Sequence, residues 1–190
     1  MPLPQCFAFR AMGSPCELRL YGAAERVARA AEVAIGELRR LEAKYSRYRD
    51  DSLTAQIQAS AGRPEGIEVD AETSGLLDYA ATAWRESEGR FDITSGVLRR
   101  AWDWKRGSLP SRAEVAALLP LVGFGRLRWE RPRLCLPLAG MQLDFGGFVK
   151  EYAADRAAAL CRDAGDLAER HGLRGYDSVH LAAYPQVTRA

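Results

Sequence analysis

The stretch LDFGGFVKEYAADRAAAL, Leu143 to Leu160, decides the fold. Asp144 stands at the end of an apolar run, two glycines follow, and Lys150 stands in the first turn of a helix that should continue through Cys161. We expect a strand over Met141–Phe145, a glycine turn and then this helix. A helix start carries partial positive charge, so a cation there is mildly unfavourable unless an anion also binds.

These residues allow two interpretations. Glycines let a ligand approach the backbone closely, and a helix N-terminus binds phosphate well, so the turn can hold a phosphate with Lys150 beside it. Asp144 would then accept hydrogen bonds from a hydroxyl or a ring N–H, or lie near a metal ion. Alternatively the glycines only make a tight turn, Asp144 caps the helix and Lys150 is solvated. A lone Asp-x-Gly-Gly does not choose between them.

A second stretch, FDITSGVLRRAWDW from Phe91 to Trp104, places an acid, a threonine and a glycine ahead of two tryptophans. Aromatic walls suit a flat heterocycle. The alternative for Trp102 and Trp104 is ordinary core packing.

The remaining pattern mixes helices and strands without strict alternation, which predicts an α+β fold. Apolar residues that recur every three or four positions indicate a long amphipathic helix over Ala23–Tyr45. Asp70 reads as the N-cap of a helix that buries Leu77, Ala80 and Trp84, and Ser111 with Glu114 has capping-box spacing. The other expected elements are a Phe7–Arg10 strand paired with Cys16–Tyr21, a short helix through Ile57, and strands at Ile67–Val69, Leu127–Trp129 and Leu134–Leu136.

Composition excludes several classes of function. The chain has 190 residues and a net charge of +2, which gives no reason to expect nucleic acid or an anionic membrane as a partner. Its four cysteines form no C-x-x-C pair, and both histidines lie in the last twenty residues, so a zinc site or a histidine-based nucleophile in the main body is not expected. With no signal peptide and no apolar run of about 20 residues, we expect a cytoplasmic protein without a membrane segment.

Four blocks together resemble the flavin transferase family, the FAD:protein FMN transferases. They are AMGSPCELRLYG, YSRYRDDSLTAQIQ, FDITSGVLRRAWDW and LDFGGFVKEYAADRAAAL, in the family's order, and the resemblance covers about Phe7 to Arg162. It implies a mixed α/β domain that uses FAD and Mg²⁺. Such an enzyme transfers FMN from FAD to a threonine or serine hydroxyl of a target flavoprotein and releases AMP.

The resemblance also implies which residues form the site, although it identifies no catalytic residue. Gly147 would supply a backbone carbonyl to magnesium. The residues implied to contact FAD are Met12, Tyr48, Trp102, Asp103, Trp104, Asp144 and Lys150.

The sequence departs from the family pattern at several positions. Gln58 stands where the family usually has Asn, Val97 replaces a common Pro, and Asp103 replaces a Gly. Glu151 replaces the Gly after Lys150 and brings a negative charge toward the expected pyrophosphate, unless it points to solvent.

The end of the chain does not match the family. We expect a C-terminally truncated transferase-like domain over 1–165 and a foreign or helical tail over 166–190. The tail resembles the end of a PIN-type ribonuclease, where Asp177 would be one acid of a metal cluster, but it also fits an amphipathic helix. The alternatives to an active transferase are therefore an inactive FAD-binding fragment, a PIN-type nuclease fragment or a marginally folded product.

Overall fold

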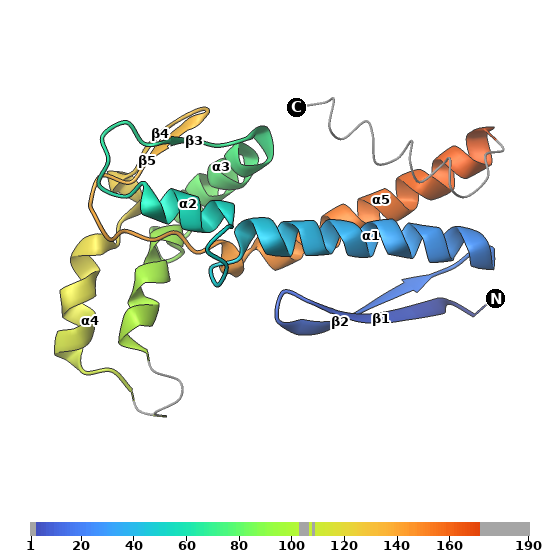
Figure 1. Ribbon diagram of the computed structural model, residues 1–190, viewed down its shortest axis with the longest axis horizontal. Helices are drawn as coiled ribbons and strands as arrows, with labels where there is room; N and C mark the ends of the chain where they lie inside the picture. The colour runs from blue at the N-terminus through green and yellow to red at the C-terminus, as the bar shows by residue number, and fades with distance from the viewer. Residues whose placement is uncertain (1–2, 103–106, 108, 172–190) are drawn as a thin grey trace. The chain divides into compact units, whose positions relative to one another are not determined.

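The computed structural model describes residues 3–102, 107 and 109–171, with the backbone alone from 165 to 171. Asp177 and most of the expected tail lie outside the described residues. The chain forms two compact units: residues 1–46 together with the chain from Phe148 onward, and residues 47–147. Helices and strands are mixed, as the predicted α+β class requires (Figure 1).

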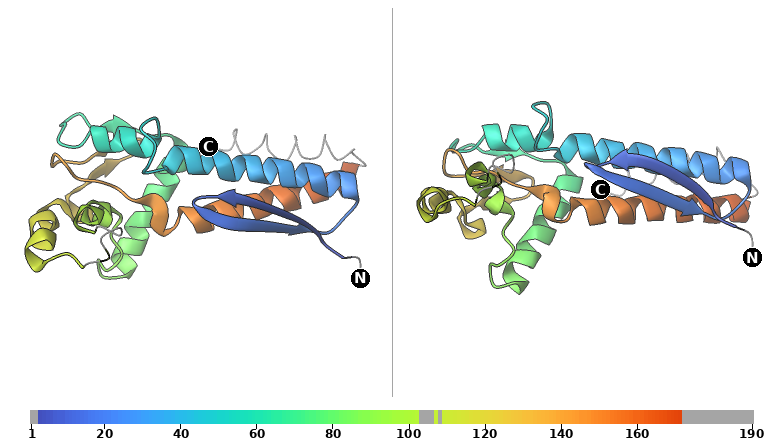
Figure 2. Two further views of the ribbon diagram at one scale, coloured as in Figure 1. Left: turned by 60° about the horizontal axis from the view of Figure 1, so that its bottom comes forward. Right: turned by 90° about the horizontal axis from the view of Figure 1, so that it is seen from below.

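The first unit is a β-hairpin beside two long helices. Strands β1 (Gln5–Ala11) and β2 (Ser14–Leu20) pair antiparallel, with Ala11 opposite Ser14. Helices α1 (Ala24–Tyr45) and α5 (Val149–His171) run side by side in opposite directions (Figures 1 and 2). The predicted hairpin and long N-terminal helix are confirmed.

Small side chains allow α1 and α5 to approach closely. Each helix presents an apolar stripe at intervals of three and four residues, as one helical face requires. The buried residues of the two stripes are Val27, Ala30, Ala31, Ala34, Leu38, Leu41 and Tyr45 on α1, and Val149, Ala153, Ala157, Leu160 and Ala164 on α5.

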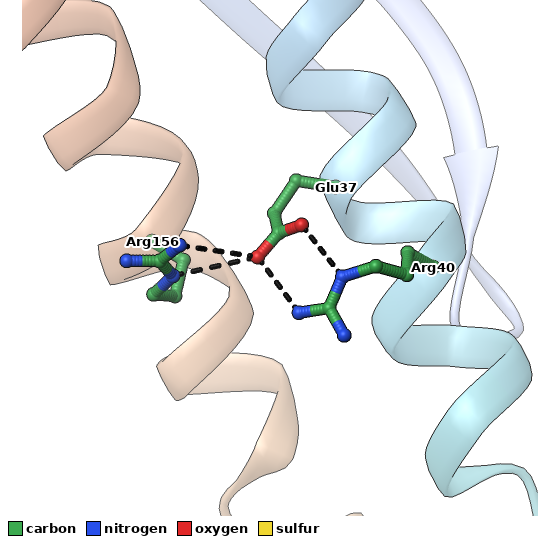
Figure 3. A network of polar contacts seen from close by, with 3 residues as sticks. All are labelled: Glu37, Arg40 and Arg156. Atoms are coloured by element: carbon green, nitrogen blue, oxygen red, sulfur yellow. Dashed lines mark hydrogen bonds and ion pairs between the residues drawn. The ribbon is translucent and has the colours of Figure 1, made fainter. Parts of the chain in front are cut away.

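A polar bridge also joins these two helices (Figure 3). Glu37 of α1 accepts hydrogen bonds from Arg40, one turn away, at 2.8 and 2.9 Å and from Arg156 of α5 at 3.4 Å. Its side chain is only 13% exposed. A carboxylate this far from water needs a partner to remain ionised, and two guanidinium groups supply it.

The second unit, 47–147, contains short elements connected by well-capped turns. Ser52 caps α2 (Leu53–Ala59), Asp70 caps α3 (Ala71–Glu86), and Ser111 with Glu114 forms the expected capping box at α4 (Arg112–Leu118). Strands β3 (Ile67–Glu68), β5 (Arg133–Cys135) and β4 (Arg128–Glu130) form a three-stranded antiparallel sheet in that order. Trp84 is half-buried rather than buried, and its ring stacks on Phe124 with centroids 5.5 Å apart.

The predicted strand Met141–Phe145 is wrong. Met141, Leu143 and Phe145 are all buried and alternate with more exposed residues, which is the pattern that suggested a strand. The backbone nevertheless makes no ladder, because the Leu143 carbonyl accepts the Gln58 side-chain amide at 3.2 Å and the Asp144 N–H donates to the Ile93 carbonyl at 2.9 Å. Residues 145–147 then form a 3₁₀ turn, η4 (Phe145–Gly147).

None of the helices in the described part of the chain combines the length and the apolar character needed to cross a bilayer.

Candidate functional site

The Phe91–Trp104 block is held in place by its own acid and threonine. One oxygen of Asp92 accepts hydrogen bonds from the N–H and the hydroxyl of Thr94, at 2.8 and 2.6 Å, and so begins the 3₁₀ helix η1 (Ile93–Ala101). Its other oxygen accepts the Phe124 N–H at 2.8 Å, and Thr94 Oγ1 accepts the Gly123 N–H at 2.7 Å. The Asp-x-Thr spacing is therefore used to bind a loop about thirty residues further along.

This block interlocks with the stretch around Asp144. A side chain built on Gly96 would place its Cβ 2.9 Å from the Asp144 Cβ and 3.2 Å from the Asp144 nitrogen, closer than atoms can pack. A Cβ on Gly147 would lie 3.2 Å from the Phe91 ring. Gly96 is thus needed for space, a side chain at 147 would crowd the Phe91 ring, and both glycines lie where two segments about fifty residues apart meet.

The turn after Asp144 combines features of both interpretations. Asp144 Oδ1 accepts the Gly146 N–H at 2.9 Å, so the acid caps the turn, and a Cβ on Gly146 would meet that same oxygen. Gly146 and Gly147 both remain exposed, so solvent reaches their backbone. Side chains of the protein itself already crowd both positions, and approach of a phosphate to them stays a prediction.

Asp144 also forms an ion pair with Arg47, a residue the sequence analysis did not single out. The Arg47 side chain is 31% exposed and that of Asp144 is 20% exposed. Burial works against the charge of Arg47, but hydrogen bonds and attraction from Tyr48 and Asp144 outweigh it and raise the pKa of the guanidinium above its ordinary value. A permanent cation therefore lies beside the Asp144 side chain.

Arg47 reaches Tyr48 as well. Its Nη2 donates to the Tyr48 hydroxyl at 2.8 Å, and its guanidinium carbon lies 4.9 Å from the centre of the ring. The hydrogen bond from Arg47 lowers the pKa of the Tyr48 hydroxyl below its ordinary value. Tyr48 is 81% exposed, so this ring belongs to the surface and not to the core. Within the unit 47–147, two of the expected FAD contacts, Tyr48 and Asp144, are connected through one arginine.

The tryptophan segment is described only in part. Trp102 follows η1 and is half-buried, and its N–H donates to the Arg99 carbonyl at 3.1 Å. Asp103 and Trp104 lie outside the described residues, so their expected FAD contacts stay predictions.

The other two expected contacts lie in the first unit. Met12 is the first residue of the two-residue turn between β1 and β2, with a φ of 52° followed by 73° at Gly13. Lys150, in the first turn of α5, is exposed and its Nζ lies 3.3 Å from the Ser14 hydroxyl, at the start of β2. The Lys150 ammonium therefore contacts Ser14, which lies two positions after Met12 in the chain. Glu151, the departure from the family pattern, is exposed.

The described residues do not fit a magnesium site by themselves. No group of three or more His, Cys, Asp or Glu side chains that could hold a metal occurs within them. The Gly147 carbonyl is the single expected ligand, and Asp144 is already engaged by Arg47 and the Gly146 N–H. Magnesium requires a near-octahedral set of oxygens, and only one is expected from these residues.

Two contributors to this region were missed or misjudged. Arg47 occupies the middle position of the Ser46-Arg47-Tyr48 segment, and that position beside an expected ligand contact was the available signal. Gln58 was noted only as a departure, whereas its amide fixes the carbonyl immediately before Asp144.

The comparisons with known proteins match the part of the chain that contains the four sequence blocks. The sequence model of the ApbE family matches residues 12–168. A FAD:protein FMN transferase of Treponema pallidum (strain Nichols) is 28% identical over 160 residues, which are 78% of this chain and 44% of the relative. A FAD:protein FMN transferase of Klebsiella pneumoniae (strain 342) is 29% identical over 155 residues, 80% of this chain and 48% of the relative.

Solved structures agree with the fold. The ApbE protein of Thermotoga maritima superposes with a TM-score of 0.73 at 26% identity, covering 81% of this chain and 51% of that one. The flavinyl transferase ApbE of Pseudomonas stutzeri, in its apo form, gives 0.72 at 24% identity, covering 84% and 52%. The chain therefore spans about half the length of each of these four proteins.

Proposed function

This chain belongs to the ApbE family, and on that premise we propose that it binds FAD and serves the transfer of FMN from FAD to a threonine or serine hydroxyl of a target flavoprotein. In that reaction the acceptor oxygen attacks the phosphorus of the FMN half. The bond from this phosphorus to the bridging oxygen breaks, AMP leaves with the bridging oxygen, and the acceptor hydroxyl loses its proton to a base.

The chain's own residues would bind and orient FAD in this reaction. Tyr48 offers an exposed ring on which a flat heterocycle can stack, and the Asp144 carboxylate can accept a hydrogen bond from a ring N–H or a hydroxyl. Lys150 brings a positive charge toward a diphosphate, whose negative charge phosphoryl transfer must offset. Magnesium, which the resemblance implies, would add to that neutralisation, with the Gly147 carbonyl as the ligand expected from this chain.

The observation that carries the proposal is the interlocking of two sequence blocks at Asp144. Gly96 leaves room for Asp144, Gln58 holds the preceding carbonyl, and Arg47 joins the carboxylate to Tyr48. Packing alone does not require an exposed aromatic ring to be tied to a partly buried carboxylate. Such an arrangement of aromatic and acidic groups is suited to a flavin or adenine ring.

Binding and transfer should be tested separately, because the chain spans about half of its relatives' length. Quenching of FAD fluorescence measures binding, and Lys150→Ala should weaken it. Arg39→Ala is the matched control, because it removes one exposed positive charge from α1 in the same unit. Absence of saturable FAD binding by the parent chain, or equal affinities for all three proteins, would argue against the proposed site.

Transfer is measured by mass spectrometry after incubation with FAD, Mg²⁺ and a target flavoprotein that carries the acceptor threonine. Covalent FMN on that residue supports the transferase. A full-length family member serves as the positive control. Saturable FAD binding without transfer would favour the alternative, an FAD-binding fragment without activity, which the single expected magnesium ligand among the described residues also favours.

A further inference from the structure

Arg47 makes three contacts that together connect the exposed surface to the core of the unit 47–147. It pairs with the Asp144 carboxylate, donates to the Tyr48 hydroxyl at 2.8 Å and lies 4.9 Å from the Tyr48 ring centre. A planar guanidinium with five donors can serve all three contacts at once. No role for this residue follows from the resemblance, because only its neighbour Tyr48 was expected to touch the ligand.

The Asp144 end of this connection is rigid. The Asp144 N–H donates to Ile93, its Oδ1 accepts from Gly146, and Gly96 packs against its Cβ. Leu143 and Phe145 on either side are fully buried. A side chain attached to such a backbone has little freedom, so Asp144 is a fixed anchor for Arg47.

The Tyr48 end is exposed. With 81% of its surface accessible, the ring is not oriented by core packing, and an exposed aromatic side chain samples several rotamers. Two directional contacts from one anchored arginine restrict that sampling. Ordering a ring before the ligand arrives removes a penalty that binding would otherwise have to overcome.

We propose that Arg47 is a positioning residue that fixes Tyr48 relative to Asp144 before FAD binds, so that the ring is already placed to stack on a flat heterocycle of the dinucleotide. This inference rests on the proposed function for its ligand, whereas the ordering of Tyr48 by Arg47 is a property of the unliganded chain. Arg47 acts through Tyr48 and need not touch FAD itself.

An arginine is required for this role. A lysine at position 47 would keep the charge beside Asp144, but an ammonium group lacks the planar fork that can bridge a carboxylate and a phenol at the same time. Arg47→Lys should therefore lose most of the affinity that Arg47→Ala loses. We expect each variant to bind FAD about three- to tenfold more weakly, the factor expected for ordering one side chain on binding.

The test is a double-mutant cycle on FAD affinity with Arg47→Ala, Tyr48→Ala and the double variant. If Arg47 acts through Tyr48, Arg47→Ala adds little further loss of affinity once Tyr48→Ala has removed the ring. Arg49→Ala is the matched control, because Arg49 is an exposed neighbour that pairs with Asp51 and its loss removes the same charge. Its affinity should equal that of the parent chain, and circular dichroism should show every variant folded.

A second measurement needs no ligand. Spectroscopic titration of the tyrosines, with Tyr48→Phe to identify the contribution of Tyr48, should show that Arg47→Ala raises the pKa of this hydroxyl toward its ordinary value of 10.0. An Arg47 that did not contact the Tyr48 hydroxyl in solution would leave this pKa unchanged.

The outcomes separate the two ideas. If the parent chain binds FAD and Arg47→Ala binds it equally well, or if the two alanine substitutions are fully additive, the positioning role is overturned while the proposed function stands. If the parent chain does not bind FAD, the proposed function fails. The titration then decides the positioning role alone, and an unchanged Tyr48 pKa in Arg47→Ala overturns it.

Discussion

Gly96→Ala should destabilise the unit 47–147, although alanine is usually the safer residue in a helical segment. The added Cβ would lie 2.9 Å from the Asp144 Cβ, 3.2 Å from its nitrogen and 3.3 Å from the Leu143 carbonyl carbon. These atoms belong to backbone or are attached directly to it, so no flexible side chain can swing away. The backbone of one segment must move, and Gly96 is buried, so the strain cannot be relieved toward solvent.

The magnitude follows from this geometry. Overpacking a tight interior by one methyl group costs about 1–3 kcal/mol of unfolding free energy. The matched control is Gly75→Ala in α3, an exposed helical glycine of the same unit where an added Cβ meets nothing within 4 Å. There the same substitution should stabilise by about 0.5–1 kcal/mol, because alanine restricts the unfolded chain and favours the helix. The two changes are identical in chemistry and opposite in expected sign.

Tryptophan fluorescence is a selective assay for this comparison. All four tryptophans, Trp84, Trp102, Trp104 and Trp129, lie between residues 47 and 147, so their emission reports on this unit. For a chain of this size a change of 1 kcal/mol shifts Tm by about 2–4 °C, so Gly96→Ala should melt measurably below, and Gly75→Ala above, the parent chain. If Gly96→Ala melts at or above the parent temperature, the interlocking of the two blocks at Asp144 is wrong.

Two further predictions concern the hairpin turn and acid stability. Met12→Asn should stabilise the first unit by up to about 1 kcal/mol, because a left-handed conformation is less unfavourable for Asn than for Met, and denaturation followed by circular dichroism measures this. If Met12 contacts the ligand, the same substitution should weaken FAD binding in a titration. Tighter binding would contradict the proposed contact. At Asp78 burial opposes the charge, but hydrogen bonds from Trp129 and Arg131 outweigh it and lower the pKa below the ordinary 3.8. A group whose pKa is lowered in the folded state stabilises the protein at pH values above its ordinary pKa, and this stability disappears as the pH falls through the folded-state pKa. Asp78→Asn should therefore flatten the acid unfolding curve measured by tryptophan fluorescence. An unchanged curve would show that Asp78 contributes little.

Local signals predicted much of the fold. The hairpin, the long helix α1, the Asp70 cap and the Ser111 capping box each depend on residues within a few positions of one another, and all four are confirmed. The strand at Met141–Phe145 failed because alternation reports which side chains are buried and does not report what the backbone bonds to. The groups that bond to this backbone belong to Gln58 and Ile93, which are distant from it in sequence.

The candidate site was predictable only where a block carried its residues. Tyr48, Asp144 and Lys150 were singled out by pattern, and their contacts with FAD stay predictions. Arg47 was not, because its importance arises from an ion pair across 97 positions that no local pattern encodes. Long-range pairs of this kind come from tertiary packing. The place of Arg47 beside Tyr48 could draw attention to it, but it does not predict Asp144 as its partner.

The charge of Lys150 bears directly on whether an anion binds beside α5. The first turn of α5 contains both Lys150 and Glu151, so the acid already offsets part of the unfavourable placement of the cation at the helix start. The nearest described partner of the ammonium is the neutral Ser14 hydroxyl, which does not balance the charge. The remaining imbalance amounts to a few tenths of a kcal/mol, too little to require a ligand for folding. Stability measurements on Lys150→Ala therefore cannot show whether a diphosphate binds there, and the FAD affinity of that variant, compared with Arg39→Ala, is the measurement that can.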